Sequence, residues 1–133
     1  MEITCTKLWT MWSKSTDRDF SIDLVNQAKA RIAKFSKEDW SEMSKETVEV
    51  TNRLADLVKN NIPVDSELAE KAFDDLMDHL DRWFFKPTYA YVSTVALITQ
   101  DTSKPMHRFF DQFEPGLGKY MSKLLLTYSR KTQ

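Results

Sequence analysis

Glycine is unusually scarce in this chain, and that scarcity limits the folds available to it. Only two glycines occur among 133 residues, and both lie in one tetrapeptide, Pro115-Gly-Leu-Gly118. Phosphate-binding loops, dinucleotide-binding turns and nucleophile elbows all need glycines that are missing here. Tight β-hairpins favour Asn-Gly or Asp-Gly at the turn, and neither dipeptide is present. The sequence therefore predicts an all-α fold.

The charges are balanced, which argues against nucleic-acid binding. The chain has 19 basic and 20 acidic residues and a net charge of −1. Proteins that bind nucleic acid directly usually carry a basic face or stripe, and no dense run of Lys and Arg is present. The length predicts a single domain over 1–133. We therefore expect one domain without a direct nucleic-acid partner.

The cysteine content and hydropathy predict a cytoplasmic protein. Cys5 is the single cysteine, which excludes an intramolecular disulfide and a multi-cysteine metal site. Glu2, Lys7 and Lys14 interrupt the N-terminal region, so a signal peptide is not expected. No stretch approaches the ~20 apolar residues of a transmembrane helix, so no membrane partner is expected.

The segment 66–92 is the centre of the predicted fold. Apolar residues recur every three or four positions and predict one helical stripe with His79 at its edge, formed by Leu68, Ala72, Leu76, Leu80 and Trp83. Pro87 is expected to end this helix and to start a second one. The pattern predicts two helices joined by an elbow that is rich in aromatic residues.

The remaining helices are predicted from periodicity and from helix-start signals. Ser36 with Asp39 has the pattern of a capping box, and Asp65 or Ser66 is expected to start the central helix. Ser103 is the expected cap of a helix with Pro105 in its first turn. We expect six or seven helices of uneven length, with a core over 20–129 and a separate segment at 1–16.

Candidate catalytic and metal-binding groups are few. Asp75 and His79 are four residues apart, but a metal site needs three or four converging ligands. Cys5 lacks a neighbouring base, and paired acidic residues on a helix mostly face water. We therefore predict no enzyme activity, no metal site and no cofactor.

Large aromatic side chains are the feature that points to a function. Each ring taken alone is better explained as part of the core, but together they exceed what a small helical core hides. Apolar pockets lined by rings and a few polar groups bind larger ligands, and six methionines would let such a pocket adapt. The predicted ligand-binding residues are His79, Trp83, Phe84, Tyr89, Tyr91, Phe109, Phe110, Phe113, Trp9 and Trp12.

Two motifs resemble those of the TipAS antibiotic-recognition domain family. The first is His79-Leu-Asp-Arg-Trp-Phe-Phe85, followed by Tyr89 and Asp101, and the second is Asp111-Gln-Phe-Glu-Pro-Gly-Leu-Gly-Lys-Tyr120. The likeness is good over 66–128 and looser over 37–63. It is specific because the motifs occur in combination.

The resemblance implies a globin-like all-α fold. It also implies that the domain captures bulky, largely apolar antibiotics, such as thiopeptides or albicidin, in a cleft between its helices. In regulators of this family the domain follows a MerR-type DNA-binding part and a coiled coil, and the segment before Phe20 is too short to hold them. One member bonds covalently to its drug through a cysteine; Pro87 stands at that position here, so covalent capture is not expected.

Two hypotheses follow. In the first, the domain binds a hydrophobic small molecule to sequester or sense it, and 1–16, with Trp9 and Trp12, forms a lid that orders on binding. In the second, the domain is a protein-interaction module, and the same groove holds a partner helix or an N-terminal segment from a second copy of the chain. A monomer or weak homodimer is expected.

Overall fold

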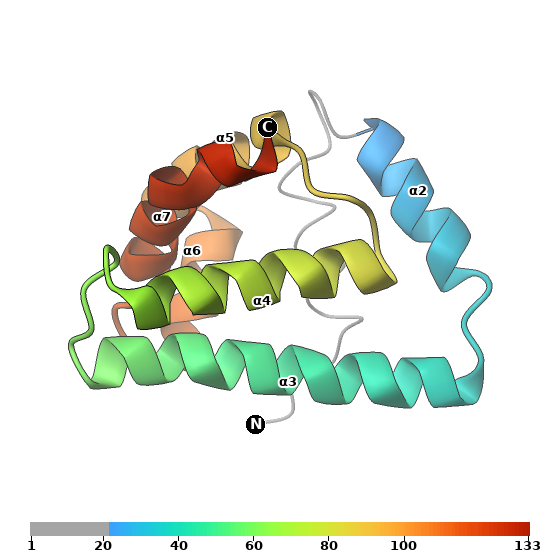
Figure 1. The fold of residues 1–133 in the computed structure, drawn as a ribbon, viewed down its shortest axis with the longest axis horizontal. Coiled ribbons are helices and arrows are strands. Elements are labelled where there is room, and N and C mark those ends of the chain that lie inside the picture. The colour runs from blue at the N-terminus through green and yellow to red at the C-terminus, as the bar shows by residue number, and fades with distance from the viewer. Residues whose placement is uncertain (1–21) are drawn as a thin grey trace.

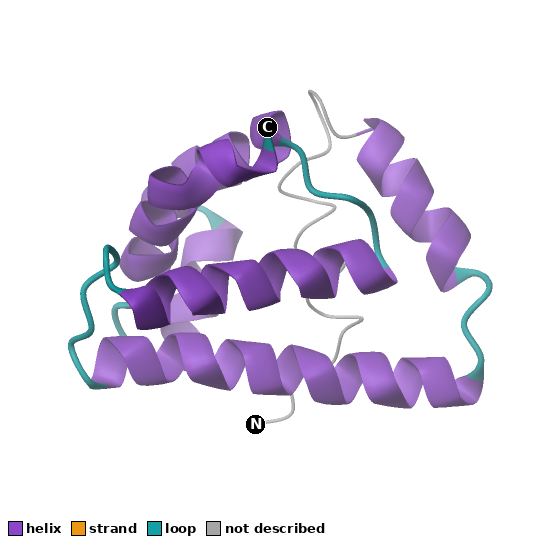
Figure 2. Cartoon of the chain, viewed as in Figure 1, coloured by secondary structure: helices purple, strands orange, loops and turns teal. Residues whose placement is uncertain are grey.

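All regular structure in the described part of the chain is helical. The computed structural model describes residues 22–133 (Figures 1 and 2). In this range it contains six α-helices and a short 3₁₀ helix, which are α2 Ile22–Ile32, α3 Lys37–Lys59, α4 Glu67–Trp83, α5 Tyr89–Gln100, α6 Pro105–Phe113, α7 Leu117–Tyr128 and η1 Ser129–Thr132. The prediction of an all-α chain with helices of uneven length is confirmed.

Two of the predicted helix starts are formed by serine caps. The Ser36 hydroxyl accepts a hydrogen bond of 3.1 Å from the Asp39 backbone, and the Asp39 carboxylate accepts one of 3.0 Å from the Ser36 backbone. This reciprocal capping box satisfies two backbone donors at the start of α3. Ser66 caps α4 by accepting from the Ala69 backbone at 3.2 Å. Both local signals were therefore correct.

The buried face of α4 differs from the predicted stripe. Leu68 is 62% exposed, whereas its neighbour Ala69 is fully buried, together with Ala72 and Phe73. The prediction that Leu68 belongs to the apolar face is wrong because the helix is rotated so that the smaller Ala69 packs inward. His79 is 2% exposed, so it lies within the buried face and not at its edge.

The elbow after α4 is longer than predicted. The helix ends at Trp83, and Phe84 and Phe85 follow it as buried residues outside regular structure. Pro87 does not begin α5, contrary to expectation; Thr88 caps that helix by accepting from the Tyr91 backbone at 3.1 Å. Proline lacks a backbone donor and disfavours the α region for the preceding residue, so it suits this extended connection.

The helices form two groups that enclose the core. Helices α3 and α4 lie antiparallel and side by side, while α5 packs along α7 and α6 lies against α7 (Figure 1). Phe73, Phe85 and Leu117 are at most 1% exposed and lie in the shared core. The interior therefore receives side chains from both groups.

Helix α2 contacts the C-terminal end of α4 through two kinds of interaction. The Arg31 guanidinium donates to the backbone carbonyl of Asp81. Phe35, which follows α2, packs edge-on against Trp40 and Trp83, with ring centroids 5.4 Å and 5.7 Å apart. Such edge-to-face pairs favour a defined ring geometry. Trp83 therefore lies between the α2–α3 connection and the elbow.

A tight corner joins α6 and α7. Gly116 has φ of +91°, which glycine adopts without strain, and Gly118 packs directly against the His107 ring. The Asp111 carboxylate accepts a hydrogen bond of 2.9 Å from the Gly118 backbone, so a side chain of α6 satisfies a donor at the start of α7. The imidazole of His107 donates from Nδ1 to the Thr99 carbonyl at 2.7 Å. This corner fixes the spacing of the two helices.

The start of α6 lacks the predicted cap. Lys104 occupies the cap position without a side-chain hydrogen bond, and Pro105 follows it in the first turn as expected. Ser103 instead donates its hydroxyl to the Asp101 carboxylate at 2.7 Å. The prediction failed because a short polar side chain such as that of Ser103 can either cap a helix or form hydrogen bonds within a turn, and the sequence pattern is the same for both.

Two tyrosines on α7 give opposite predictions for removal of a hydroxyl group. The Tyr128 hydroxyl donates to the Val64 carbonyl at 2.8 Å, whereas the buried Tyr120 hydroxyl has no hydrogen-bond partner within residues 22–133. Tyr128→Phe should lower the free energy of unfolding by about 1 kcal/mol. Tyr120→Phe should leave it unchanged or raise it, because a buried unpaired hydroxyl costs free energy. Urea unfolding of both variants tests this; an equal loss in both would contradict the assignment.

Candidate functional site

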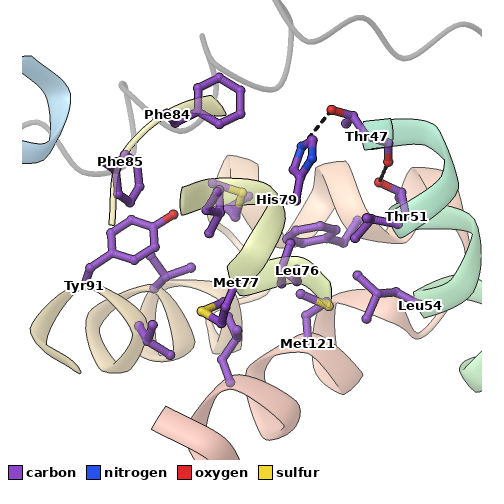
Figure 3. A pocket seen from close by; sticks show the side chains of 17 residues that line it. Thr47, Thr51, Leu54, Leu76, Met77, His79, Phe84, Phe85, Tyr91 and Met121 are labelled. Atoms are coloured by element: carbon purple, nitrogen blue, oxygen red, sulfur yellow. Dashed lines mark hydrogen bonds between the residues drawn. The ribbon is translucent and has the colours of Figure 1, made fainter. Parts of the chain in front are cut away.

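A largely apolar cavity lies where five helices meet. Its volume is about 100 Å³. Figure 3 shows the side chains around it, which come from α3 to α7 and from the elbow. The lining residues are Thr47, Val50, Thr51, Leu54, Leu76, Met77, His79, Leu80, Phe84, Phe85, Tyr91, Val92, Val95, Met106, Phe110, Met121 and Leu125.

The polar groups of the lining lie mainly on one side. Thr47 and Thr51 come from neighbouring turns of α3, and His79 faces them from α4 (Figure 3). Phe84, Phe85 and Tyr91 lie on the other side in that view. No Asp, Glu, Lys or Arg is among the described residues of the lining. The cavity can therefore hold an apolar group and offer it a polar contact at one edge.

The cavity brings together four of the ten predicted ligand-binding residues, His79, Phe84, Tyr91 and Phe110. Four others, Trp83, Tyr89, Phe109 and Phe113, are not among its lining residues. Tyr89 is 39% exposed at the start of α5, and Phe109 is buried edge-on against Phe110, with ring centroids 5.6 Å apart. Trp9 and Trp12, and with them the predicted lid at 1–16, lie outside the described residues.

No local signal in the sequence indicates that α3 contributes to the cavity. Thr47, Thr51 and Leu54 line the cavity, but in the sequence they read as ordinary positions on one apolar helix face. Their role arises because α4 packs antiparallel to α3 and brings His79 opposite Thr47. A contact between residues 32 positions apart leaves no trace in helical periodicity.

Glu46 organises the polar side of the site. Its Oε1 accepts hydrogen bonds from His79 Nδ1 at 2.7 Å and from Trp83 Nε1 at 3.1 Å, and its Oε2 pairs with Arg82. The three partners occupy i, i+3 and i+4 on α4 and therefore share one helix face. Trp83 thus does not line the cavity but shares the carboxylate that holds His79.

The imidazole of His79 is held on both sides. Its Nε2 lies 2.9 Å from the Thr47 hydroxyl, which is also 2.8 Å from the Met43 carbonyl. The hydroxyl can donate its one hydrogen to Nε2 of a neutral ring, or accept from Nε2 of a protonated ring while it donates to Met43. Either state keeps both contacts of the imidazole. Hydrogen bonding alone therefore does not select the protonation state.

Burial favours the neutral imidazole. Desolvation lowers the pKa of His79, and the Arg82 charge acts in the same direction, against the opposing effect of Glu46. Burial raises the pKa of Glu46, but the hydrogen bonds that its carboxylate accepts from His79 and Trp83, together with the charge of Arg82, outweigh this and lower it. The site is therefore best described as a neutral His79 beside an ionised Glu46.

The lowered pKa of His79 predicts that stability falls in mild acid. Unfolded histidine titrates near pH 6.5, so below that pH the unfolded chain binds a proton more readily than the folded chain. The stability that comes from keeping His79 neutral is fully present above about pH 6.5, and it is lost as the pH falls toward the pKa of His79 in the folded protein. The free energy of unfolding of the wild type should drop more steeply between about pH 7 and pH 5 than that of His79→Gln. Urea unfolding across this range tests it; parallel profiles would contradict it.

Residues 22–133 contain neither a metal-binding cluster nor a helix suited to span a membrane. No group of three or more His, Cys, Asp or Glu side chains is arranged to hold a metal ion there. None of the helices in this range combines the length and apolar character that crossing a membrane requires.

Two curated relatives are transcriptional activators. The chain is 29% identical over 104 residues to the HTH-type transcriptional activator TipA of Streptomyces coelicolor and, at the same identity, to that of Streptomyces lividans. In each case the match covers 78% of this chain and 41% of the relative. The chain therefore spans about two fifths of the length of these activators.

A solved structure shares the fold. It is the Streptomyces lividans protein TipAS in complex with nosiheptide, described as part of a thiopeptide antibiotic multidrug resistance system. The TM-score is 0.70 at 23% sequence identity, and the likeness covers 98% of this chain and 97% of the other. The predicted globin-like all-α fold is confirmed.

The family model for the TipAS antibiotic-recognition domain matches residues 11–128. This range includes every helix of the described structure up to the end of α7, and therefore every residue of the cavity lining. The chain belongs to the TipAS antibiotic-recognition domain family.

Proposed function

We propose that this chain binds a bulky, largely hydrophobic antibiotic of the thiopeptide kind, non-covalently, at the cavity between α3 and α7. The observation that carries the proposal is the cavity itself, an apolar space among five helices with one buried histidine at its polar edge. Concave, mostly apolar sites with a few placed polar groups are typical of small-molecule binding. Binding, and not catalysis, is the activity that this arrangement supports.

The ligand-binding residues fall into two roles. Phe84, Tyr91 and Phe110 provide ring surfaces next to the apolar lining, and His79 provides a polar contact. Trp83 acts indirectly, because its indole shares Glu46 with His79. Trp9 and Trp12 remain predicted contacts from a lid that orders on binding.

The relatives suggest the biological setting. The curated relatives are transcriptional activators, and the TipAS structure is described as part of a resistance system. We therefore propose that the domain either sequesters the antibiotic or serves as the effector part of a regulator, in the cytoplasm and as a monomer or weak homodimer. Contact with nucleic acid would then be made by another part of such a regulator.

A titration with nosiheptide tests the proposal. Tryptophan fluorescence of the full chain should change saturably, and the melting temperature should rise with ligand concentration, because a ligand that binds the folded state stabilises it. Albicidin and an uncharged polar compound of similar size serve as comparison ligands. No saturable response to either antibiotic, with a melting temperature that depends on protein concentration, would favour the protein-interaction hypothesis.

Two variants of one helix locate the binding site. Phe110 lines the cavity and Phe113 does not, although both are half-buried in α6. Phe110→Leu should weaken nosiheptide binding, whereas Phe113→Leu should have little effect on it. Equal weakening by both variants would indicate a site elsewhere.

A further inference from the structure

His107 is a buried titratable side chain that the proposed antibiotic site does not use. It lies on α6, is 7% exposed and is not among the residues that line the cavity. Its ring packs against Gly118 at the start of α7, where a Cβ atom would lie 2.7 Å from Nδ1. The Thr99 carbonyl, in the last turn of α5, lies 2.7 Å from the same nitrogen. The imidazole therefore occupies the point where α5, α6 and α7 meet, in space that the missing side chain at 118 leaves open.

Both ring nitrogens of His107 face groups that only accept hydrogen bonds. Nδ1 lies 2.7 Å from the Thr99 carbonyl oxygen, and Nε2 lies 3.2 Å from Oδ2 of Asp111. A carbonyl oxygen and an ionised carboxylate have no hydrogen to donate. A neutral imidazole carries a proton on one nitrogen, so the lone pair of the other would point at an acceptor. Both contacts are hydrogen bonds only when His107 is doubly protonated.

The other buried histidine is held differently. The Nε2 atom of His79 faces the Thr47 hydroxyl, which can either donate or accept. The two contacts of His79 therefore persist whether or not its ring is charged. The contact between His107 and Asp111 does not, because neither partner can donate once the Nε2 proton is gone. Of the two rings, only His107 makes a helix-to-helix connection that depends on a proton.

The surroundings of Asp111 favour its ionised form. Its Oδ1 accepts a hydrogen bond of 2.9 Å from the Gly118 backbone, in the first turn of α7. Backbone donors at this end of a helix stabilise a negative charge. The Asp111 side chain is also 40% exposed, so water reaches the carboxylate. A proton between His107 and Asp111 therefore belongs on the imidazole.

The groups nearest to the His107 ring favour a positive charge there. The Thr99 carbonyl belongs to the C-terminal turn of α5, which carries a partial negative charge. Asp101 provides a second carboxylate close by. Hydrogen bonds from Ser103 lower the pKa of the Asp101 carboxyl, and the charges of Lys104 and His107 act in the same direction. Two carboxylates and a helix end thus offset the cost of burying an imidazolium.

The remaining titratable groups around the corner do not compete with this arrangement. The only titratable side chain of α5, Tyr89, lies at its other end. The others are Lys104 and Arg108 beside and on α6, and Lys119, Tyr120 and Lys123 on α7, and within residues 22–133 none forms a hydrogen bond or ion pair with His107 or Asp111. The four cationic side chains are exposed. Glu114, after α6, pairs instead with Lys59 of α3 at 3.6 Å.

We propose that His107 is a buried imidazolium and that, together with Thr99 and Asp111, it forms a pH-dependent latch between the end of α5 and the corner that joins α6 to α7. The protonated ring links Thr99 to Asp111, which in turn holds the start of α7. Loss of the Nε2 proton breaks the bond to Asp111 and leaves the bond to Thr99. Because α6 also contributes Met106 and Phe110 to the cavity lining, the latch sets how firmly that wall is held.

Nitrogen-15 NMR of the histidine rings in the full chain tests the protonation pattern. The chain has two histidines, so comparison with His79→Gln assigns the signals of His107. At about pH 5.5 both ring nitrogens of His107 should carry a proton, and at about pH 9 only Nδ1 should. A ring with a single proton at the lower pH, or with its single proton on Nε2 at the higher pH, would overturn the proposal.

A double-mutant cycle tests whether the proton makes the connection. His107→Gln and Asp111→Asn are introduced singly and together, and urea unfolding is measured at the same two pH values. At about pH 5.5 the losses should not add, with a coupling of about tenfold in the folding equilibrium constant. At about pH 9 the losses should add. All four proteins retain His79, so its own titration cancels. Equal coupling at both pH values, or none in acid, would contradict the latch.

Asp101→Asn is the matched control for a general effect of charge. It removes the other carboxylate near the ring, which is exposed and has no hydrogen bond to His107. Its coupling to His107→Gln should be small at both pH values; coupling as large as that of Asp111 would count against the proposal. If His107→Gln does not fold, Asp111→Asn alone decides. In it the Nε2 proton of His107 should exchange with water faster than in the wild type, and unchanged exchange would overturn the latch. None of these tests uses an antibiotic, so their failure leaves the proposed function standing.

Discussion

Glu46→Ala is expected to lower the free energy of unfolding by about 2 kcal/mol and to weaken nosiheptide binding about tenfold. The carboxylate accepts from His79 and Trp83 and pairs with Arg82. Its removal leaves the buried Nδ1–H of His79 without that acceptor, and an unsatisfied buried donor costs about 1–3 kcal/mol. The side chain of Glu46 is 24% exposed, so water can replace part of the loss. Urea unfolding and a fluorescence titration measure the two effects.

Two further variants separate this role from a general effect of charge. Glu49→Ala removes an exposed glutamate of the same helix. It should change the free energy of unfolding and the affinity for nosiheptide only a little. Glu46→Gln keeps the size and one acceptor oxygen, so it should lose less stability than Glu46→Ala. If Glu49→Ala and Glu46→Ala had the same effect, the shared carboxylate would not be what holds His79.

Gly118→Ala should destabilise the protein by about 3 kcal/mol, although alanine normally stabilises a helix by up to about 1 kcal/mol relative to glycine. A Cβ atom at this position would lie 2.7 Å from His107 Nδ1 and 2.9 Å from two ring carbons. The imidazole would have to move, and the hydrogen bond from Nδ1 to the Thr99 carbonyl would be lost. Thermal or urea unfolding shows directly whether Gly118→Ala lowers or raises the stability of the protein.

The same corner provides a double-mutant test. In a His107→Ala background the ring is absent, so Gly118→Ala should no longer destabilise and should show the usual helix preference for alanine. Gly116→Ala should also destabilise, but for a different reason: its Cβ would meet only Val58, at 3.5 Å, while φ of +91° is unfavourable for alanine. A Gly118→Ala variant that is more stable than the wild type would contradict the contact described here.

Local signals in the sequence predicted most of the helices. The caps at Ser36 and Ser66 depend on residues within a few positions of one another, so they can be recognised without tertiary structure. The buried face was harder to predict. In α4 an exposed Leu68 next to a buried Ala69 shows that size and hydrophobicity do not fix helix rotation.

The candidate site was only partly predictable, for a related reason. Nearly every position of α5 is apolar or small, so periodicity could not distinguish the exposed Tyr89 from the buried Tyr91. The pairing of His79 with Glu46 and Thr47 depends on how α3 packs against α4. Aromatic content indicated that a cavity could form, but the residues around it are decided by tertiary packing.

The shared carboxylate of Glu46 also constrains how this domain can evolve. Three residues on one face of α4, His79, Arg82 and Trp83, depend on a single side chain of α3. A substitution at 46 changes the partner of all three at once, whereas a substitution at any one of them leaves two pairings in place. In natural variants of this domain, position 46 should therefore change rarely, and then together with 79 and 83, so that these positions vary as a group while their exposed neighbours drift independently.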